Sequence, residues 1–174
     1  MALFKFQNYS AIKNLQDNPR VVATQETVNG NVFSIVDNDE DSGYKEAAVP
    51  FADANAAKAG EVWVMMNIVD KPEIHNYADY SVKAGEYIRA VNLSKQVGEI
   101  VELSGDLVVS NDVKVGDTLV PCNVDDDATN PMSWKKVADA SGYTCHLEVT
   151  DLTTFGLFTI DNAGVGYEAK IKSA

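Results

Sequence analysis

The sequence predicts an all-β protein, an antiparallel β-barrel or sandwich with an extended N-terminal arm and little helix. Short runs rich in β-branched and aromatic residues alternate with Gly, Asn, Asp and Pro turn signals about every eight to twelve residues. A phrase of small apolar residue, Lys, small apolar residue, Gly and acid occurs at residues 57–61, 82–86 and 113–117. Only residues 9–15 and 52–59 suggest helical turns, so strands must supply most of the core.

The repeated phrase predicts a tight turn that leads into a strand. Its Gly can adopt the positive φ that such turns need, and its Lys and acid keep the turn in water. An Asn follows seven residues after each Gly, at Asn67, Asn92 and Asn123. Two interpretations stay open: a common turn that recurs by convergence, or internal duplication of a turn-and-strand unit.

Residues 1–20 are predicted to form a docking arm. The alternation in residues 3–6 indicates a short strand that pairs with another edge, and Pro19 ends the helical turns that follow. The arm carries a net charge of about +2 (three basic residues and one acid), whereas the remainder is acidic. The docking side chains would be Leu3, Phe4, Lys5, Phe6, Tyr9, Lys13 and Arg20.

In the first half of the body, a strand is expected over residues 20–26. Asn29-Gly30 predicts a hairpin into a second strand over residues 31–36. Residues 44–59 indicate an irregular connection with a helical turn at 52–59, and residues 61–69 indicate a strand.

In the second half, the pattern becomes more regular, with a hairpin across residues 140–142. Strands are expected over residues 86–93, 98–103, 106–110, 117–124, 134–139, 143–150, 155–160 and 166–172. The predicted organisation is an arm (1–20), an N-terminal β region (21–80) and a C-terminal barrel-like region (81–174), with the last two either separate or one compact domain.

A net charge of −12 over 174 residues argues against binding to phosphate backbones, which are held by Lys and Arg. The sequence has no apolar run long enough to span a membrane and no Sec signal pattern, so we expect synthesis and folding in a cytoplasm. Cys122 and Cys145 lie in apolar runs and are expected to be buried free thiols rather than a disulfide.

Candidate sites of chemistry are few, and no metal, cofactor or catalytic residue is predicted. The acid runs at 37–41 and 125–127 do not place ligands at EF-hand spacing, which favours solvated turns. His146 follows Cys145 in a strand, so their side chains should point to opposite faces, unlike a catalytic dyad. Several aromatic residues suggest either core packing or a sugar-stacking platform: Trp63, Trp134, Tyr87, Tyr143, Phe155 and Phe158.

Three stretches of the second half resemble small β-rich head proteins of tailed bacteriophages, which include decoration, cement and head-fibre-base proteins. They are the turn at 113–119 (Val-Lys-Val-Gly-Asp-Thr-Leu), the strand at 134–139 (Trp-Lys-Lys-Val-Ala-Asp) and the segment at 149–155 (Val-Thr-Asp-Leu-Thr-Thr-Phe). The opening residues 1–6 are similar to phage structural proteins with a short docking arm. The resemblance covers about residues 82–172, and its motifs are largely those of turns.

The resemblance implies a non-enzymatic protein that binds the exterior of an assembled capsid, often as a trimer, and bridges neighbouring subunits of the major capsid protein. Its location would be the virion surface, and neither nucleic acid nor membrane would be a partner. Two alternatives remain: another phage structural β-module of the tail, baseplate or head-fibre base, and a carbohydrate-binding module or metal-assisted enzyme.

Overall fold

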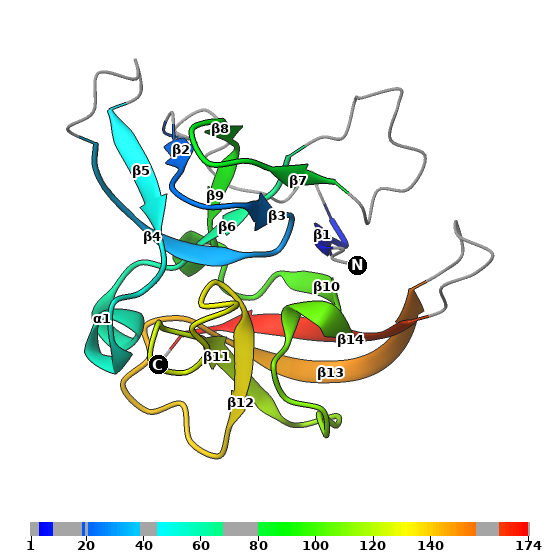
Figure 1. The fold of residues 1–174 in the computed structure, drawn as a ribbon. Coiled ribbons are helices and arrows are strands. Elements are labelled where there is room, and N and C mark those ends of the chain that lie inside the picture. Colours follow the sequence, from blue (N-terminus) through cyan, green and yellow to red (C-terminus); the bar gives the residue numbers. More distant parts are fainter. Residues whose placement is uncertain are drawn as a thin grey trace.

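The computed structural model describes residues 4–8, 19, 21–38, 45–67, 80–155 and 164–173, with the side chains of 153–155 and 164 left aside. It confirms the predicted all-β class. The described residues form two six-stranded sheets and a two-stranded ribbon, with one short α-helix, α1 (Ala54–Ala59), and two 3₁₀ helices. Figure 1 shows the first sheet in the upper half of the molecule and the second sheet below it.

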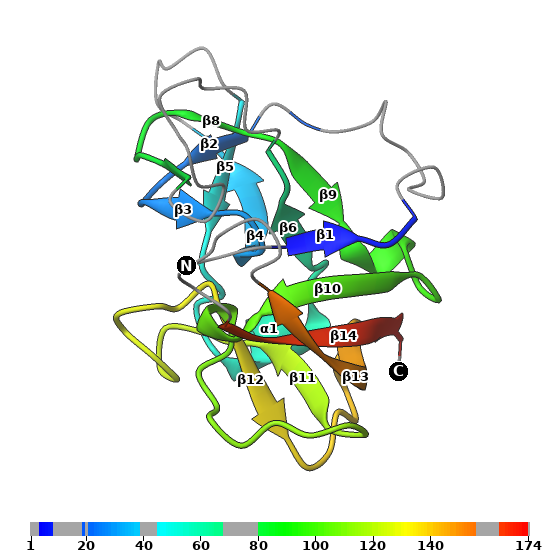
Figure 2. The same ribbon diagram turned by 90° about the vertical axis from the view of Figure 1, so that its right-hand side faces the viewer.

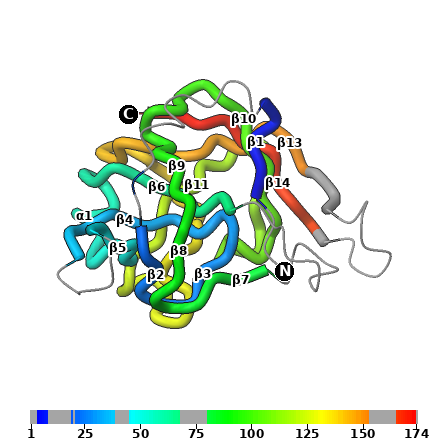
Figure 3. Tube along the Cα trace, turned by 90° about the horizontal axis from the view of Figure 1, so that it is seen from above, coloured from blue at the N-terminus to red at the C-terminus, as the bar shows by residue number. Residues whose placement is uncertain are grey.

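The first sheet forms a nearly closed barrel from the N-terminal half. In spatial order its strands are β8 (Tyr87–Ile88), β2 (Val21–Ala23), β5 (Glu46–Val49), β4 (Val32–Asp37), β6 (Trp63–Met65) and β9 (Ala90–Asn92). The pairing is antiparallel except between β2 and β5. The outermost strands β8 and β9 are separated in the chain by Arg89 alone, and Figure 3 shows them as one continuous stretch. This near-closure leaves little free sheet edge.

The second sheet is antiparallel throughout and is built mainly from the C-terminal half. In spatial order its strands are β1 (Phe4–Phe6), β10 (Ile100–Ser104), β14 (Gly164–Lys172), β13 (His146–Phe155), β11 (Thr118–Pro121) and β12 (Trp134–Val137). A separate ribbon pairs β3 (Thr27–Val28) with β7 (Ser81–Val82). After β9 the chain enters the second sheet through the 3₁₀ helix Leu93–Lys95.

Strand β6 shows how the two sheets share the hydrophobic core. Trp63 and Met65 face the interior of the first barrel, while Val62 and Val64 belong to the larger core under the second sheet. Alternate side chains of a strand point to opposite faces, so one strand serves both cores. The first barrel is therefore packed on the second sheet through its outer wall.

The predicted turn at Asn29-Gly30 is present, but its two flanking strands do not form a hairpin. Gly30 has φ +94°, and the Asn31 N–H donates to the Val28 carbonyl at 3.1 Å. However, β3 pairs with β7, whereas β4 pairs with β5 and β6. The turn residues form hydrogen bonds with Met65 instead. The Gly30 N–H donates to the Met65 carbonyl at 2.9 Å, and the Met65 N–H donates to the Asn31 carbonyl at 3.0 Å.

Three further strand predictions need correction. Strands β12 and β13 do not form the expected hairpin across 140–142, because both pair with β11, which lies between them. Residues 105–107 form a 3₁₀ helix where a strand over 106–110 was expected. The region 44–59 contains strand β5, which was predicted as irregular, although the expected helical turn exists as α1, capped by the Asp53 side chain.

Candidate binding surfaces

The N-terminal residues chosen for docking are in part core residues. Phe4 is 7% exposed and Phe6 is 1% exposed, and their rings meet edge to face at 5.7 Å between centroids. Lys5 points to the other face and forms an ion pair with Glu102 at 2.8 Å. Figures 1 and 2 show β1 between the first barrel and β10. Phe4 and Phe6 are therefore not available to a partner in this fold, which corrects that part of the docking-arm hypothesis.

The remaining docking residues, Leu3, Tyr9, Lys13 and Arg20, lie outside the described residues. Of the seven proposed docking residues, Lys5 alone is both described and exposed.

Two of the three repeated phrases form the same turn. The N–H groups of Lys83 and Lys114 donate to the side chains of Glu86 and Asp117 at 2.9 and 2.7 Å. In each case the acid's N–H returns to the Lys carbonyl at 3.1 Å. Gly85 and Gly116 have φ +86° and +90°, as the third position of a type II turn requires.

Both turns also bond to a neighbouring strand in the same way. Gly85 N–H donates to Ala23 O and Gly116 N–H to Val149 O, each at 2.8 Å. The remaining phrase, at residues 57–61, differs because Asp53 caps α1 and the helix runs through residues 54–59. There Gly60 ends the helix with φ −75° and donates to Ala56 O. The phrase therefore specifies a local turn only where no helix cap precedes it.

Substitution of Gly85 or Gly116 by Ala is expected to lower the free energy of unfolding by about 1 kcal/mol each. An added Cβ would meet no atom within 4 Å at either position, so the loss reports backbone strain alone. Urea denaturation measures it, with Val115→Ala as the exposed neighbour control, for which a change below about 0.5 kcal/mol is expected. Equal stability of the Gly variants and wild type would show that these turns do not require positive φ.

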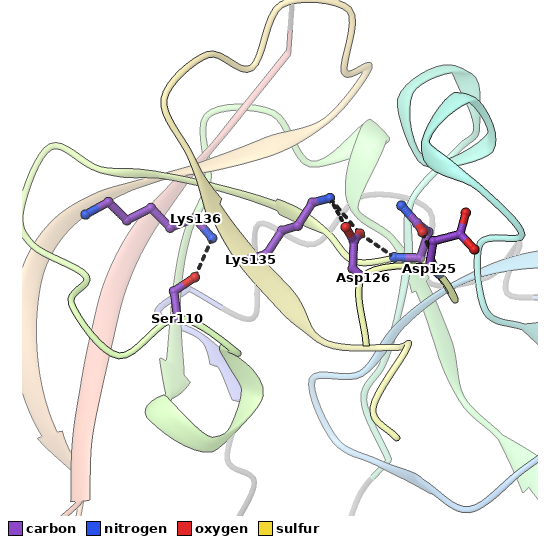
Figure 4. Close-up of polar contacts among 6 residues, drawn as sticks. Ser110, Asp125, Asp126, Lys135 and Lys136 are labelled. Carbon is purple, nitrogen blue, oxygen red and sulfur yellow. Dashed lines mark hydrogen bonds and ion pairs between the residues drawn. The ribbon is translucent and has the colours of Figure 1, made fainter. Parts of the chain in front are cut away.

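The second acid run is used in turn formation. Asp126 accepts the Asn123 N–H at 3.0 Å. It also forms an ion pair with Lys135, as Figure 4 shows. Asp127 accepts hydrogen bonds from the Thr129 hydroxyl and N–H, which lower the pKa of its carboxyl group. The described residues contain no cluster of His, Cys, Asp and Glu arranged to hold a metal ion. The first acid run lies largely outside the described residues.

The cysteines are buried free thiols, as predicted. Burial raises the pKa of Cys122 to about 11 and that of Cys145 to about 12, so both stay protonated at neutral pH and are poor nucleophiles. His146 is partly buried and pairs in register with Lys172. Burial, with a smaller contribution from the Lys172 charge, lowers the pKa of His146, which favours its neutral form.

A cleft of about 440 Å³ lies beside β12. It is lined by Ser110, Asp112, Gly116, Asp117, Thr118, Lys136, Val137 and Ala138. Lys136 Nζ contacts Asp117 at 3.0 Å and Asp112 at 3.3 Å, so its charge is already compensated. The hydrogen bond to Asp117 raises the pKa of Lys136.

The edge of β12 is covered by the segment that lines this cleft. Ser110 Oγ accepts the Lys136 N–H at 3.1 Å, and Val109 N–H donates to Trp134 O at 2.8 Å. Figure 4 shows Lys135 and Lys136 on opposite sides of the strand. The contacts protect a sheet edge, which is a structural role.

A second cleft, of about 480 Å³, lies at one end of the first barrel. It is lined by Pro19, Ser34, Ile35, Glu46, Gly60, Glu61 and Trp63; we call it the barrel mouth. Trp63 and Ile35 are partly buried and pack against the interior core of the barrel. Two carboxylates therefore accompany a partly exposed indole. Such a site, at the mouth of a β-barrel, is a common place for ligands.

The other aromatic residues considered for sugar stacking are differently placed. Trp134 is fully buried, with its Nε1 donating to Gly30 O at 3.3 Å, and Tyr143 is 4% exposed. Tyr87 is exposed, whereas the side chains of Phe155 and Phe158 lie outside the described part of the structure. Of the six aromatic residues, Trp63 is one that lines a cleft in the described part of the chain.

Comparisons with protein families, curated proteins and solved structures find no match to this chain. Within the described residues, no helix has the length and hydropathy needed to cross a membrane.

Proposed function

We propose that this chain is a non-enzymatic structural protein that binds the outer surface of a tailed-phage capsid and stabilises it by bridging shell subunits. The observation that carries the proposal is the distribution of charge. The net charge is −12, and several lysines are compensated by ion pairs within the chain. These pairs are Lys5–Glu102, Lys135–Asp126, Lys136 with Asp112 and Asp117, and Lys172–Glu148.

Compensated lysines do not offer free positive charge to a phosphate backbone, so the surface disfavours nucleic acid and attracts basic protein surfaces. Complementary charge of this kind raises association rates and sets the register of docking. The same property suits a protein that must find a fixed shell from solution.

The scaffold supports the same role. Exposed side chains are held in fixed positions by three features: the nearly closed first barrel, the covered edge of β12, and the turns at 82–86 and 113–117, in which an acidic side chain accepts a backbone N–H. A rigid surface loses little conformational entropy on binding. Repetition over the symmetry of a shell multiplies weak contacts into high avidity, which is consistent with the homo-oligomer, often a trimer, that the family resemblance implies.

Binding to purified heads of the encoding phage tests the proposal. The protein should co-sediment with the heads at about 50 mM NaCl. Its affinity for the heads should fall at least about tenfold by about 500 mM NaCl, because salt screens exposed charges. Duplex DNA at equal mass is the control and should retain none. Binding to tails or baseplates instead of heads would favour the alternative phage module. Retention on DNA, or on no particle at all, would refute the proposal.

A further inference from the structure

We infer that the barrel mouth binds a basic side chain, an arginine by preference, from the surface of a partner protein. The inference deepens the proposed function and rests on it, because it names the site and the chemistry through which an acidic protein would contact a basic shell.

The barrel mouth is built in part by side chains that face the interior of the first barrel. Along β6, Trp63 and Met65 point inward, and Glu61 continues the same alternation toward the open end. On β5, Ala48 is in the interior core, and Glu46, two residues earlier, lines the cleft. The floor is therefore apolar and the rim carries two carboxylates.

The two rim carboxylates differ from the five acids that form ion pairs with lysine. Glu102, Glu148, Asp112, Asp117 and Asp126 each contact a lysine. Among the described residues, neither Glu46 nor Glu61 has an ion-pair partner. The cleft therefore concentrates negative charge against a low-dielectric apolar wall, where a cation is attracted more strongly than on an open surface.

A buried asparagine holds one of these carboxylates in place. Asn92 lies opposite Trp63 in the β6–β9 pairing, is 5% exposed, and donates from Nδ2 to Glu61 Oε2 at 3.0 Å. Its Oδ1 is buried and has no hydrogen-bond partner within the described structure. Buried polar groups normally find a partner, so Asn92 is an exception, but it lies behind Glu61 and is not one of the residues that line the cleft.

Arginine fits this combination better than other ligands. Its planar guanidinium stacks on an indole face and donates to carboxylates, and it is less strongly hydrated than the lysine ammonium. A neutral sugar also stacks on indoles, but it would leave both carboxylate charges uncompensated. Uncompensated charge in the mouth therefore selects a cation.

The two indole N–H signals of the protein provide a direct test in ¹⁵N-correlated NMR spectra. Titration with Nα-acetyl-arginine amide should shift the Trp63 signal, with half-saturation on the order of 10 mM, as expected for one exposed cation–π contact and two surface charge pairs. The buried Trp134 signal should not move. The lysine analogue should need a higher concentration, and equal NaCl alone should not reproduce the shift.

A charge-matched pair of variants separates the site from general electrostatics. The double variant Glu46→Gln, Glu61→Gln should lower the affinity for the arginine probe about tenfold. The double variant Glu99→Gln, Asp125→Asn, which has the same change in net charge, should keep that affinity within about twofold of wild type. The denaturation midpoint of each variant verifies folding. Equal weakening by both pairs, or an unmoved Trp63 signal, would overturn the inference.

Failure of this inference and failure of the proposed function give different results. If heads bind in a salt-dependent manner but the arginine probe does not shift Trp63, the site is wrong and the capsid role stands. If the probe binds but heads do not, the capsid role is wrong. A Trp63 shift with methyl glycosides and none with arginine would overturn the inference in favour of carbohydrate recognition.

Discussion

Phe6→Ala is expected to lower the free energy of unfolding by about 3–5 kcal/mol, the range typical of a buried Phe. Phe6 is 1% exposed and belongs to a core cluster that includes Val64 of the first barrel and Leu103 of the second sheet. Truncation would leave a cavity where the two sheets meet. Single domains are stable by only about 5–15 kcal/mol, so this one change would remove a large fraction of the total.

Chemical denaturation of Phe6→Ala beside Lys5→Ala makes the comparison within one strand. Lys5 is exposed, and its pair with Glu102 should contribute at most about 1 kcal/mol. An unchanged denaturation midpoint for Phe6→Ala would contradict the placement of β1 in the core and would support the docking-arm hypothesis for Phe4 and Phe6.

Gly30→Ala is expected to lower the free energy of unfolding by about 2–5 kcal/mol, because two costs combine there. Gly30 has φ +94°, which strains a residue with a Cβ by about 1–2 kcal/mol. The added Cβ would also overlap Leu107 Cδ1 and lie 2.8 Å from Phe4 Cβ. Overpacking of this kind costs about 1–3 kcal/mol.

Gly98→Ala is the matched control, because Gly98 has φ +97° but nothing within 4 Å of the added Cβ. Its expected loss is about 1 kcal/mol. The difference between the two variants measures the packing of the turn on β1 and on the 3₁₀ helix Gly105–Leu107. Equal losses at Gly30 and Gly98 would show that the turn is not packed against Phe4.

The sequence was sufficient to predict the fold class, because turn residues and alternating side chains are local signals. It predicted the turn at Asn29-Gly30 and the strand near Phe4-Phe6, but not which strands they pair with. Pairing depends on contacts far apart in the chain, such as Phe6 with Val101 and Gly30 with Met65. The basic charge of residues 1–20 suggested docking on another protein, but it gave no sign that Phe4 and Phe6 are buried in the core.

The candidate site could be predicted only in part, because it too depends on residues that are far apart in the chain. Trp63 was recognised as an aromatic residue that could bind a ligand. Glu61, two residues earlier in the same segment, lies on the same face as Trp63. Glu46 was missed because strand β5 contains Ala47 and Ala48, which have little β propensity, and the segment was predicted to be irregular. Closure of the barrel brings these side chains to one cleft, which no local pattern indicates.

Footprinting of carboxylates on the bound protein tests the central claim most directly. Carbodiimide coupling to glycinamide, read by peptide mass spectrometry, would compare the free protein with the protein on purified heads. We expect Glu46 and Glu61 to lose most of their labelling on heads, while Glu99 and Asp125 keep theirs. Undiminished labelling of Glu46 and Glu61 on saturated heads would contradict the claim that this acidic barrel mouth contacts the shell.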